Sequence, residues 1–184
     1  MKKYKIIYAY PPWTYQNSTV PQGGVSAQYS TMNLQDIKNL PIKDLADDTC
    51  VLFIWVTFPM LSEGLEVIKS WGFEYKTLGF SWIKTNPKNG QPFFGIGYYA
   101  KSNCEVCLMA TKGKVHPLVK SNKVSSVVIT PRREHSRKPD EVREKIIELF
   151  GDLPRIELFA RQIHEGWDVW GNEVESSITL YNGI

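Results

Sequence analysis

The run Ile6-Ile7-Tyr8-Ala9-Tyr10-Pro11-Pro12-Trp13 joins a continuous apolar segment to two prolines and a tryptophan. Residues 6–9 predict a short strand that is buried on both faces, as in the middle of a parallel sheet. Pro11 and Pro12 lack the N–H group that a sheet ladder needs, so the strand must end in a stiff turn. Open α/β sheets bind ligands at such turns, at the carboxyl ends of central strands. An ordinary strand end with two structural prolines would leave the same pattern.

Further apolar runs along the chain predict more strands, and some of these runs are followed by helical patterns. The other predicted strands cover residues 50–56, 78–84, 105–111, 125–130, 155–160 and 167–170. A short helix is predicted after the N-cap Asn33, and longer ones after Pro59 and Pro139. In the helix after Pro59, the residues Leu61, Leu65 and Ile68 fall on one face and predict its buried side.

Strands that alternate with helices predict a three-layer α/β sheet. The connection between the strands at 78–84 and 105–111 carries no helix, so these two strands are predicted to form an antiparallel hairpin at one edge of an otherwise mostly parallel sheet. The sequence shows no internal repeat and no linker. We therefore expect residues 1–184 to form a single domain.

Composition limits the classes of protein that fit. Hydrophobic residues make up 42% and charged residues 22%, as in soluble globular proteins, and the net charge is +3. Each of the three cysteines (Cys50, Cys104, Cys107) lies in an apolar run, which predicts reduced thiols in a cytoplasmic protein. The Cys-x-x-Cys spacing at 104–107 has no second pair, so no metal site is predicted. Neither a signal peptide nor a membrane span is expected.

Several ordered runs together resemble the MT-A70 family, whose members use S-adenosylmethionine to methylate the exocyclic N6 amine of adenine in RNA or DNA. The proline turn resembles the family's Asp-Pro-Pro-Trp signature, with Tyr10 in place of the Asp. The other similar runs are Tyr29-Ser30-Thr31-Met32, Leu52-Phe53-Ile54-Trp55-Val56-Thr57, Trp82-Ile83-Lys84-Thr85-Asn86, Ser136-Arg137-Lys138-Pro139-Asp140-Glu141, Ile156-Glu157-Leu158-Phe159-Ala160-Arg161 and Trp170-Gly171-Asn172-Glu173. The resemblance implies a Rossmann-like class I methyltransferase sheet with a circularly permuted motif order, in which the catalytic turn comes first and the cofactor motifs last.

The resemblance also implies S-adenosylmethionine as the cofactor. The residues that it places at the cofactor are Tyr10, Lys138, Phe159, Arg161, Asn172 and Glu173. Lys138 stands ahead of a helix start and would bind the cofactor's carboxylate, unless it is a solvated surface lysine. Asn172 and Glu173 would contact the ribose or form a polar turn. Arg161 would hold Glu173 or the cofactor, or it would form a structural ion pair. The strand at 155–160, which resembles the family's cofactor strand, lacks a Gly-x-Gly-x-x-Gly fingerprint, and this weighs against a nicotinamide or flavin enzyme.

The departure at position 10 concerns catalysis directly. The resemblance assigns the catalytic turn to Tyr10, Pro11, Pro12 and Trp13, where the family's Asp and first proline carbonyl accept hydrogen bonds from the adenine amine. A phenol is neutral at pH 7 and accepts hydrogen bonds less strongly than a carboxylate. Loss of a group in such a role costs about 10²–10⁴ in rate, so we expect impaired activity. Trp13 would stack on the base or wall the pocket, unless it is a core tryptophan.

Nucleic-acid binding should depend on a local patch, because the net charge is small. The candidate substrate-binding residues are Trp13, Tyr29, Lys84, Arg132, Arg133 and Arg137. The arginines, together with Lys112 and Lys114, would contact phosphates in a salt-sensitive manner. Each of these charges taken singly fits a solvated loop equally well, and Tyr29 would either contact the target base or pack its loop.

We therefore expect transfer of a methyl group to adenine in nucleic acid. DNA is favoured because the chain is minimal and carries no RNA-binding appendage. The alternative is an inactive relative that keeps the cofactor pocket and binds nucleic acid or a partner, and the family implies a homodimer or a paired methyltransferase subunit. An unrelated Rossmann-like nucleotide binder would instead have no affinity for S-adenosylmethionine.

Overall fold

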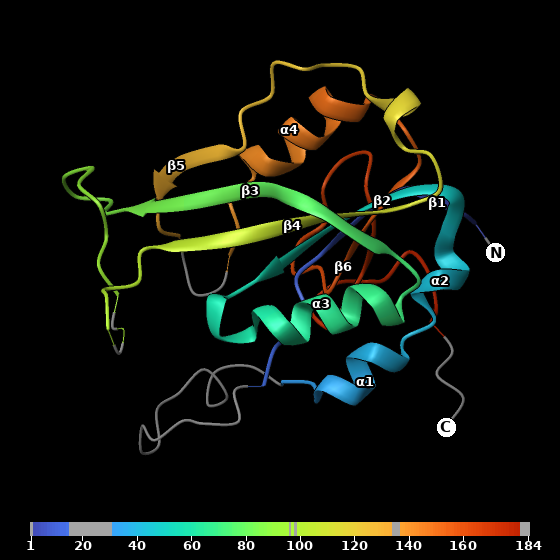
Figure 1. The fold of residues 1–184 in the computed structure, drawn as a ribbon, viewed down its shortest axis with the longest axis horizontal. Helices are drawn as coiled ribbons and strands as arrows, with labels where there is room; N and C mark the ends of the chain where they lie inside the picture. Colours follow the sequence, from blue (N-terminus) through green and yellow to red (C-terminus); the bar gives the residue numbers. More distant parts are fainter. Residues whose placement is uncertain (1, 15–30, 96, 98, 134–136, 181–184) are drawn as a thin grey trace.

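The structure is a computed structural model that describes residues 2–14, 31–95, 97, 99–133 and 137–180. Within these ranges, seven strands form one sheet in the order β5-β3-β4-β2-β1-β6-β7 (Figure 1). The strands are β1 (Tyr4–Ala9), β2 (Ala46–Val56), β3 (Glu74–Thr85), β4 (Cys104–Lys112), β5 (Val127–Pro131), β6 (Arg155–Leu158) and β7 (Asp168–Trp170). The helices are α1 (Leu34–Asn39), α2 (Ile42–Leu45), α3 (Leu61–Ser70) and α4 (Glu141–Phe150), with short 3₁₀ turns η2 (Phe58–Met60) and η3 (His116–Leu118). No helix in these ranges is long and apolar enough to cross a membrane.

The sheet confirms the predicted three-layer α/β class and corrects one detail. Every strand runs in the same direction except β4, which is antiparallel to both β2 and β3. The predicted antiparallel pair of β3 and β4 is therefore present, but it is not the edge of the sheet. Strand β5 pairs in parallel with β3 and lies outside it. Local sequence patterns could not show this, because the chain after β4 must pass over β3 before β5 pairs on the far side of that strand.

The predicted double burial of β1 is confirmed. Ile7 and Ala9 belong to the hydrophobic cluster on the side of α1, α2 and α3, whereas Ile6 and Tyr8 belong to the cluster on the side of α4. Figure 1 shows α4 above the sheet and α1 and α3 below it. Strand β1 pairs with β2 on one side and with β6 on the other, so it is an inner strand. Its carboxyl end is therefore flanked by the carboxyl ends of two other parallel strands.

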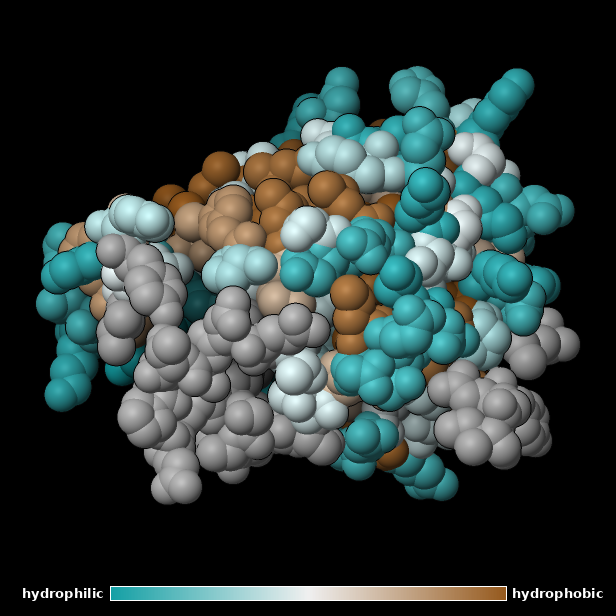
Figure 2. Space-filling view, turned by 60° about the horizontal axis from the view of Figure 1, so that its bottom comes forward, coloured by the Kyte–Doolittle hydropathy of each residue, from teal (hydrophilic) through white to brown (hydrophobic). Residues whose placement is uncertain are grey.

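The buried side of α3 differs from the prediction. Gly64, Val67 and Ile68 are buried, whereas Leu65 is 38% exposed. A Cβ atom on Gly64 would lie 2.4 Å from Cγ1 of Val56, so the helix approaches β2 most closely at its glycine, and Leu65 is turned outward. Leu65 and Phe58 add exposed apolar surface to this side of the molecule, and Figure 2 shows hydrophobic residues gathered in one region of the face that carries α3.

Candidate active site

A cavity of about 770 Å³ opens at the edge of the sheet where the parallel strands β1, β2, β6 and β7 have their carboxyl ends. This volume is typical of sites for cofactors and other small molecules. The described lining residues are Tyr10, Pro12, Trp13, Thr14, Thr31, Met32, Asn33, Asp36, Thr57, Glu105, Phe159, Ala160, Arg161, Trp170, Gly171, Asn172 and Glu173. The cavity thus joins the proline turn to the segments that follow β6 and β7, which are far apart in the sequence.

The proline turn is fixed by hydrogen bonds at several points. The Trp13 N–H donates to the Pro11 carbonyl at 2.9 Å, and the Met32 N–H donates to the Pro12 carbonyl at 3.0 Å. The indole Nε1 of Trp13 donates to the backbone carbonyl of Trp55 at the end of β2, at 3.1 Å. Trp13 is only 3% exposed, so it is a core tryptophan that also forms part of the cavity wall.

Lys138 is not the solvated surface lysine that the sequence left open, because its side chain is only 5% exposed. Its ammonium group lies 3.7 Å from the centroid of the Tyr10 ring and 5.5 Å from that of Trp55. The same group pairs with one carboxylate oxygen of Glu105, and the Lys84 ammonium pairs with the other. Tyr10 and Glu105, which both contact the Lys138 ammonium, line the cavity, whereas Lys138 is not among the lining residues.

The charges of Lys138, Lys84 and Glu105 stabilise one another. Burial by itself would raise the pKa of the Glu105 carboxyl, but the ammonium groups of Lys138 and Lys84 outweigh burial and lower that pKa. Burial by itself would lower the pKa of Lys138, but Tyr10 and Glu105 outweigh burial and raise it. Both groups are therefore charged at neutral pH, and the ion pair that they form is largely shielded from water.

The segments after β6 and β7 meet in a close contact. Phe159 has a φ of 60°, which is unusual for a residue with a side chain and occurs most often at functional sites. Its ring packs edge-on against Trp170, with the ring centroids 5.3 Å apart. Beyond this pair, Nε of Arg161 and Oε1 of Glu173 form an ion pair at 2.8 Å. The structure thus brings four of the predicted cofactor residues, including Asn172, to the cavity that Tyr10 also lines.

Replacing Gly171 by Ala should destabilise this part of the protein. A Cβ atom at this position would lie 2.2 Å from the Ala160 carbonyl oxygen and 2.7 Å from its nitrogen, and backbone atoms cannot turn aside as a side chain can. We expect a loss of about 2 kcal/mol in the free energy of unfolding, measured by urea denaturation. Gly90 has no neighbour within 4 Å of such a Cβ atom, although its positive φ adds some strain to an alanine there. An equal loss in Gly171→Ala and Gly90→Ala would contradict the explanation by close contact.

The cationic residues that were predicted to bind substrate lie outside the described cavity lining. Arg132 stacks on the Phe93 ring at 4.4 Å, and Lys84 lies 5.0 Å from the centroid of the Trp82 ring. Arg133 pairs with Asp140 and Glu141, and Arg137 pairs with Asp140, so acidic residues at the start of α4 offset the charge of these two arginines. Tyr29 falls outside the residues that the structure describes.

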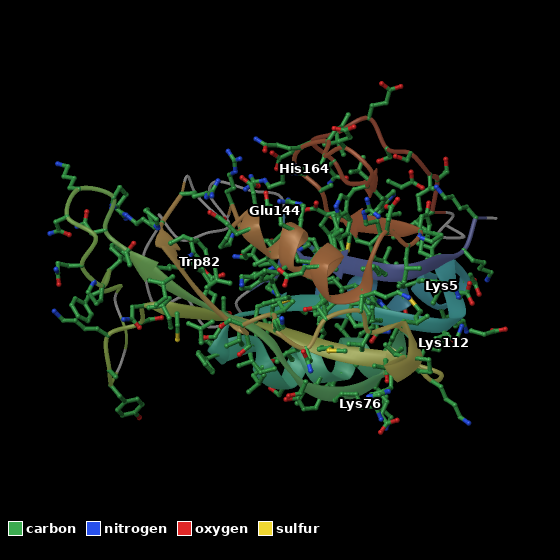
Figure 3. The ribbon with its side chains drawn as sticks, turned by 90° about the horizontal axis from the view of Figure 1, so that it is seen from above. Lys5, Lys76, Trp82, Lys112, Glu144 and His164 are labelled. Carbon is green, nitrogen blue, oxygen red and sulfur yellow. The ribbon has the colours of Figure 1, made fainter. Side chains whose placement is uncertain are left out.

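Two further candidates do not belong to this site. Lys112 pairs across the sheet with Cys50 in β2, at the opposite edge from the cavity, and its ammonium donates to the Ala46 carbonyl at 3.3 Å. Figure 3 shows Lys112 on the same side as Lys5 and Lys76, away from Trp82. Lys114 follows in the turn after β4. Lys112 therefore lies away from the cavity, and phosphate contacts by these two lysines stay a prediction.

Sequence reasoning missed several residues of the cavity. Asn33 was noted only as the N-cap of a short helix, where its side chain does accept the Asp36 N–H at 2.8 Å, yet Asn33 and Asp36 both line the cavity. Thr57 and Glu105 were not singled out at all. The signal for Glu105 was present, because it is the only acidic residue in the apolar run of β4, and such a charge needs a partner when it is buried.

The sheet order, together with a cavity between the proline turn and the segments after β6 and β7, is consistent with a Rossmann-like methyltransferase fold. The MT-A70 family model matches residues 4–173, and the chain belongs to the MT-A70 family. It is a methyltransferase by this membership, and methyltransferases of this family are generally dependent on S-adenosylmethionine.

Relatives of this chain differ greatly in length. The type II methyltransferase M.MunI from Mycoplasma sp. is 35% identical over 94% of this chain and 78% of its own length. A probable N(6)-adenosine-methyltransferase MT-A70-like protein from rice is 30% identical over 99% of this chain and 24% of its own length. The human N(6)-adenosine-methyltransferase catalytic subunit METTL3 is 28% identical over 94% of this chain and 28% of its own length. The chain thus spans only about a quarter of the rice and human relatives.

Proposed function

We propose that this chain belongs to an S-adenosylmethionine-dependent enzyme that methylates the N6 amine of adenine in DNA, and that Tyr10 impairs its activity. The observation that carries the proposal is the cavity itself. It brings Tyr10, Pro12 and Trp13 of the proline turn to Phe159 and Glu173 of the segments after β6 and β7. A methyl donor and an amine acceptor must meet in one site of this kind for transfer to take place.

The residues present fit the cofactor. The Glu173 carboxylate is an acceptor for ribose hydroxyl groups, and Arg161 holds it in place at 2.8 Å. Asn172 offers both an amide donor and an acceptor beside it. The Phe159 ring supplies an apolar wall, and the glycine at position 171 leaves room for the backbone of Ala160. When bound, S-adenosylmethionine supplies a methyl group on a positively charged sulfur.

The proline turn would receive the adenine. The Pro11 carbonyl already accepts one hydrogen bond from Trp13, and its second lone pair can accept one from the adenine amine. Trp13 is held rigidly by β2 and would wall the base pocket. The missing part is a carboxylate at position 10, where the phenol ring packs against Lys138 instead. This is why we propose that the arrangement binds its ligands but transfers the methyl group slowly.

DNA is the polymer that we propose. The chain is more similar to a type II methyltransferase than to the rice and human relatives, whose names specify adenosine, a ribonucleoside. We also propose a cytoplasmic location, because Cys50, Cys104 and Cys107 are free thiols, as is usual in a reducing compartment. Assembly with a second methyltransferase subunit is a further proposal that rests on the family alone.

The second candidate function is a binding module without catalysis. The ring of Tyr10 lines the cavity and lies 3.7 Å from the Lys138 ammonium. Position 10 thus carries an aromatic ring that contacts a cation, in place of a carboxylate that would accept a hydrogen bond from adenine. Such a chain would keep its affinity for the cofactor and for nucleic acid and would support a catalytic partner.

Calorimetric titration with S-adenosylmethionine tests the part that both candidates share. We expect binding, and we expect Asn172→Ala to weaken it about tenfold, since one hydrogen bond to a ligand contributes roughly 1.5 kcal/mol. Glu175→Ala is the matched control, because Glu175 is exposed in the same segment but is not among the residues that line the cavity. Absence of binding by the unchanged chain would contradict both candidate functions.

A further inference from the structure

The described residues of the segment 86–103 between β3 and β4, which are all except 96 and 98, form an arm that projects beyond the sheet, drawn in light green in Figure 1. The arm contains two lysines, four aromatic residues and no acidic residue. Backbone hydrogen bonds fix its shape, from the Asn86 N–H to the Gln91 carbonyl at 2.7 Å and from the Gly95 N–H to the Ser102 carbonyl at 2.6 Å. The arm therefore has a backbone shape fixed by hydrogen bonds, a net positive charge and a high content of aromatic residues.

Aromatic rings on the arm are exposed and are accompanied by cations. Phe94 is 59% exposed and Tyr99 is fully exposed. The Lys101 ammonium lies 5.7 Å from the Phe94 ring centroid, and Arg132 stacks on Phe93 at 4.4 Å. A single exposed ring is ordinary on a protein surface. Two exposed rings, two cations that lie against rings of the arm and the absence of acidic residues from the segment together form a surface that suits a polyanion with flat apolar faces.

The arm stands beside the candidate active site. Because β3 and β1 run in the same direction, the arm leaves the sheet at the same edge as Tyr10. The Phe93 N–H donates to the Lys84 carbonyl at 2.8 Å, and the Lys84 ammonium pairs with Glu105, which lines the cavity. A strand of nucleic acid that enters the cavity would therefore pass close to the arm.

We infer that the arm binds the single-stranded segment of nucleic acid that flanks the target adenine. Phe94 and Tyr99 stack on its bases, and Lys88 and Lys101 contact its phosphates. A base that is to be methylated must leave the stack, so its neighbours lose stacking partners that the rings can replace. This inference rests on the proposed function for the identity of the target base, and it adds the element that holds the flanking strand.

The test is the affinity of the full chain for a fluorescently labelled single-stranded DNA oligonucleotide with one adenine, measured by anisotropy at several salt concentrations. We expect Phe94→Ala and Tyr99→Ala each to weaken binding by about fivefold to a hundredfold, as for the loss of one stacked base. We expect Lys88→Glu combined with Lys101→Glu to reduce the slope of log K against log salt by about 1.4, as for two lost phosphate contacts on a single strand.

Matched controls come from the opposite edge of the sheet. Tyr75 is a 45% exposed ring of β3, and Lys76 follows it far from the arm (Figure 3). Tyr75→Ala and Lys76→Glu should bind the oligonucleotide like the unchanged chain. Unchanged binding of S-adenosylmethionine shows that the arm variants are folded.

The possible outcomes separate the inference from the function on which it rests. Equal affinities of the arm variants and the unchanged chain would overturn the inference. So would arm variants that keep their affinity but lose self-association in sedimentation, because the arm would then be a protein interface. A chain that binds S-adenosylmethionine but no oligonucleotide at all would contradict the proposed substrate, and the inference would fall with it.

Discussion

Replacement of Tyr10 by Asp should raise the rate of methyl transfer by about 10²–10⁴, the usual effect of restoring a positioned acid–base group. An aspartate carboxylate at the end of β1 would accept a hydrogen bond from the adenine amine next to the Pro11 carbonyl. The shorter side chain would also remove the ring that lies against the Lys138 ammonium and open that cation to the cavity. Lys84, Lys138 and Glu105 carry one net positive charge, and a second carboxylate would balance it.

The measurement is transfer of labelled methyl from S-adenosylmethionine to DNA and RNA oligonucleotides, with the products separated as nucleosides. Tyr10→Asn is the matched control, because Asn has the size of Asp but lacks its charge. If Asn restores as much activity as Asp, then uncovering the cavity matters and the carboxylate does not. If the Tyr10 chain transfers as fast as the Asp variant, the proposed impairment is wrong. The preferred oligonucleotide decides between DNA and RNA.

Replacement of Glu105 by Gln should cost about 3 kcal/mol in the free energy of unfolding, because breaking a buried ion pair leaves an uncompensated charge behind. The Lys138 side chain is only 5% exposed, and the Lys84 side chain is 22% exposed, so water cannot fully replace the lost carboxylate. Urea denaturation measures the loss. Adding Lys138→Met to Glu105→Gln should recover part of the stability, since the methionine keeps the volume without the charge.

A surface ion pair provides the comparison. Glu66 pairs with Lys38 at 3.0 Å, but its side chain is 55% exposed. Replacement of Glu66 by Gln should therefore cost less than about 1 kcal/mol. If the two substitutions have the same effect, burial does not determine the contribution of Glu105.

Acidification provides a second check on the same carboxylate. Lys138 and Lys84 outweigh burial and hold the pKa of Glu105 below its usual value, so its ion pairs stabilise the fold at a pH above the unfolded pKa of about 4.3. That contribution is lost as the pH falls through the lower pKa of the folded state. The difference in stability between the unchanged chain and Glu105→Gln should therefore shrink below about pH 4.3. A difference that stays constant would show that the carboxylate acts by packing rather than by charge.

Local sequence properties were sufficient for the elements that place the site. The unbroken apolar run of residues 6–9 predicted a strand buried on both faces, and Pro11 and Pro12 predicted the turn that ends it. These features follow from side-chain polarity and from the missing proline N–H groups, which do not depend on distant parts of the chain. The order of the motifs also identified the family, and the departure at Tyr10 can be read directly from the sequence.

Only the tertiary structure decided how the charged side chains are paired. It showed that Glu105 bridges Lys84 and Lys138, that Tyr10 lies against Lys138, and that the charge of Arg133 is offset at the start of α4. It also placed β5 outside β3. Sequence periodicity shows which face of a strand is buried, but it does not show which strands become neighbours, because many pairings bury the same faces equally well. Ion pairs between residues far apart in the chain depend on that choice, so the fold had to be known before they could be assigned.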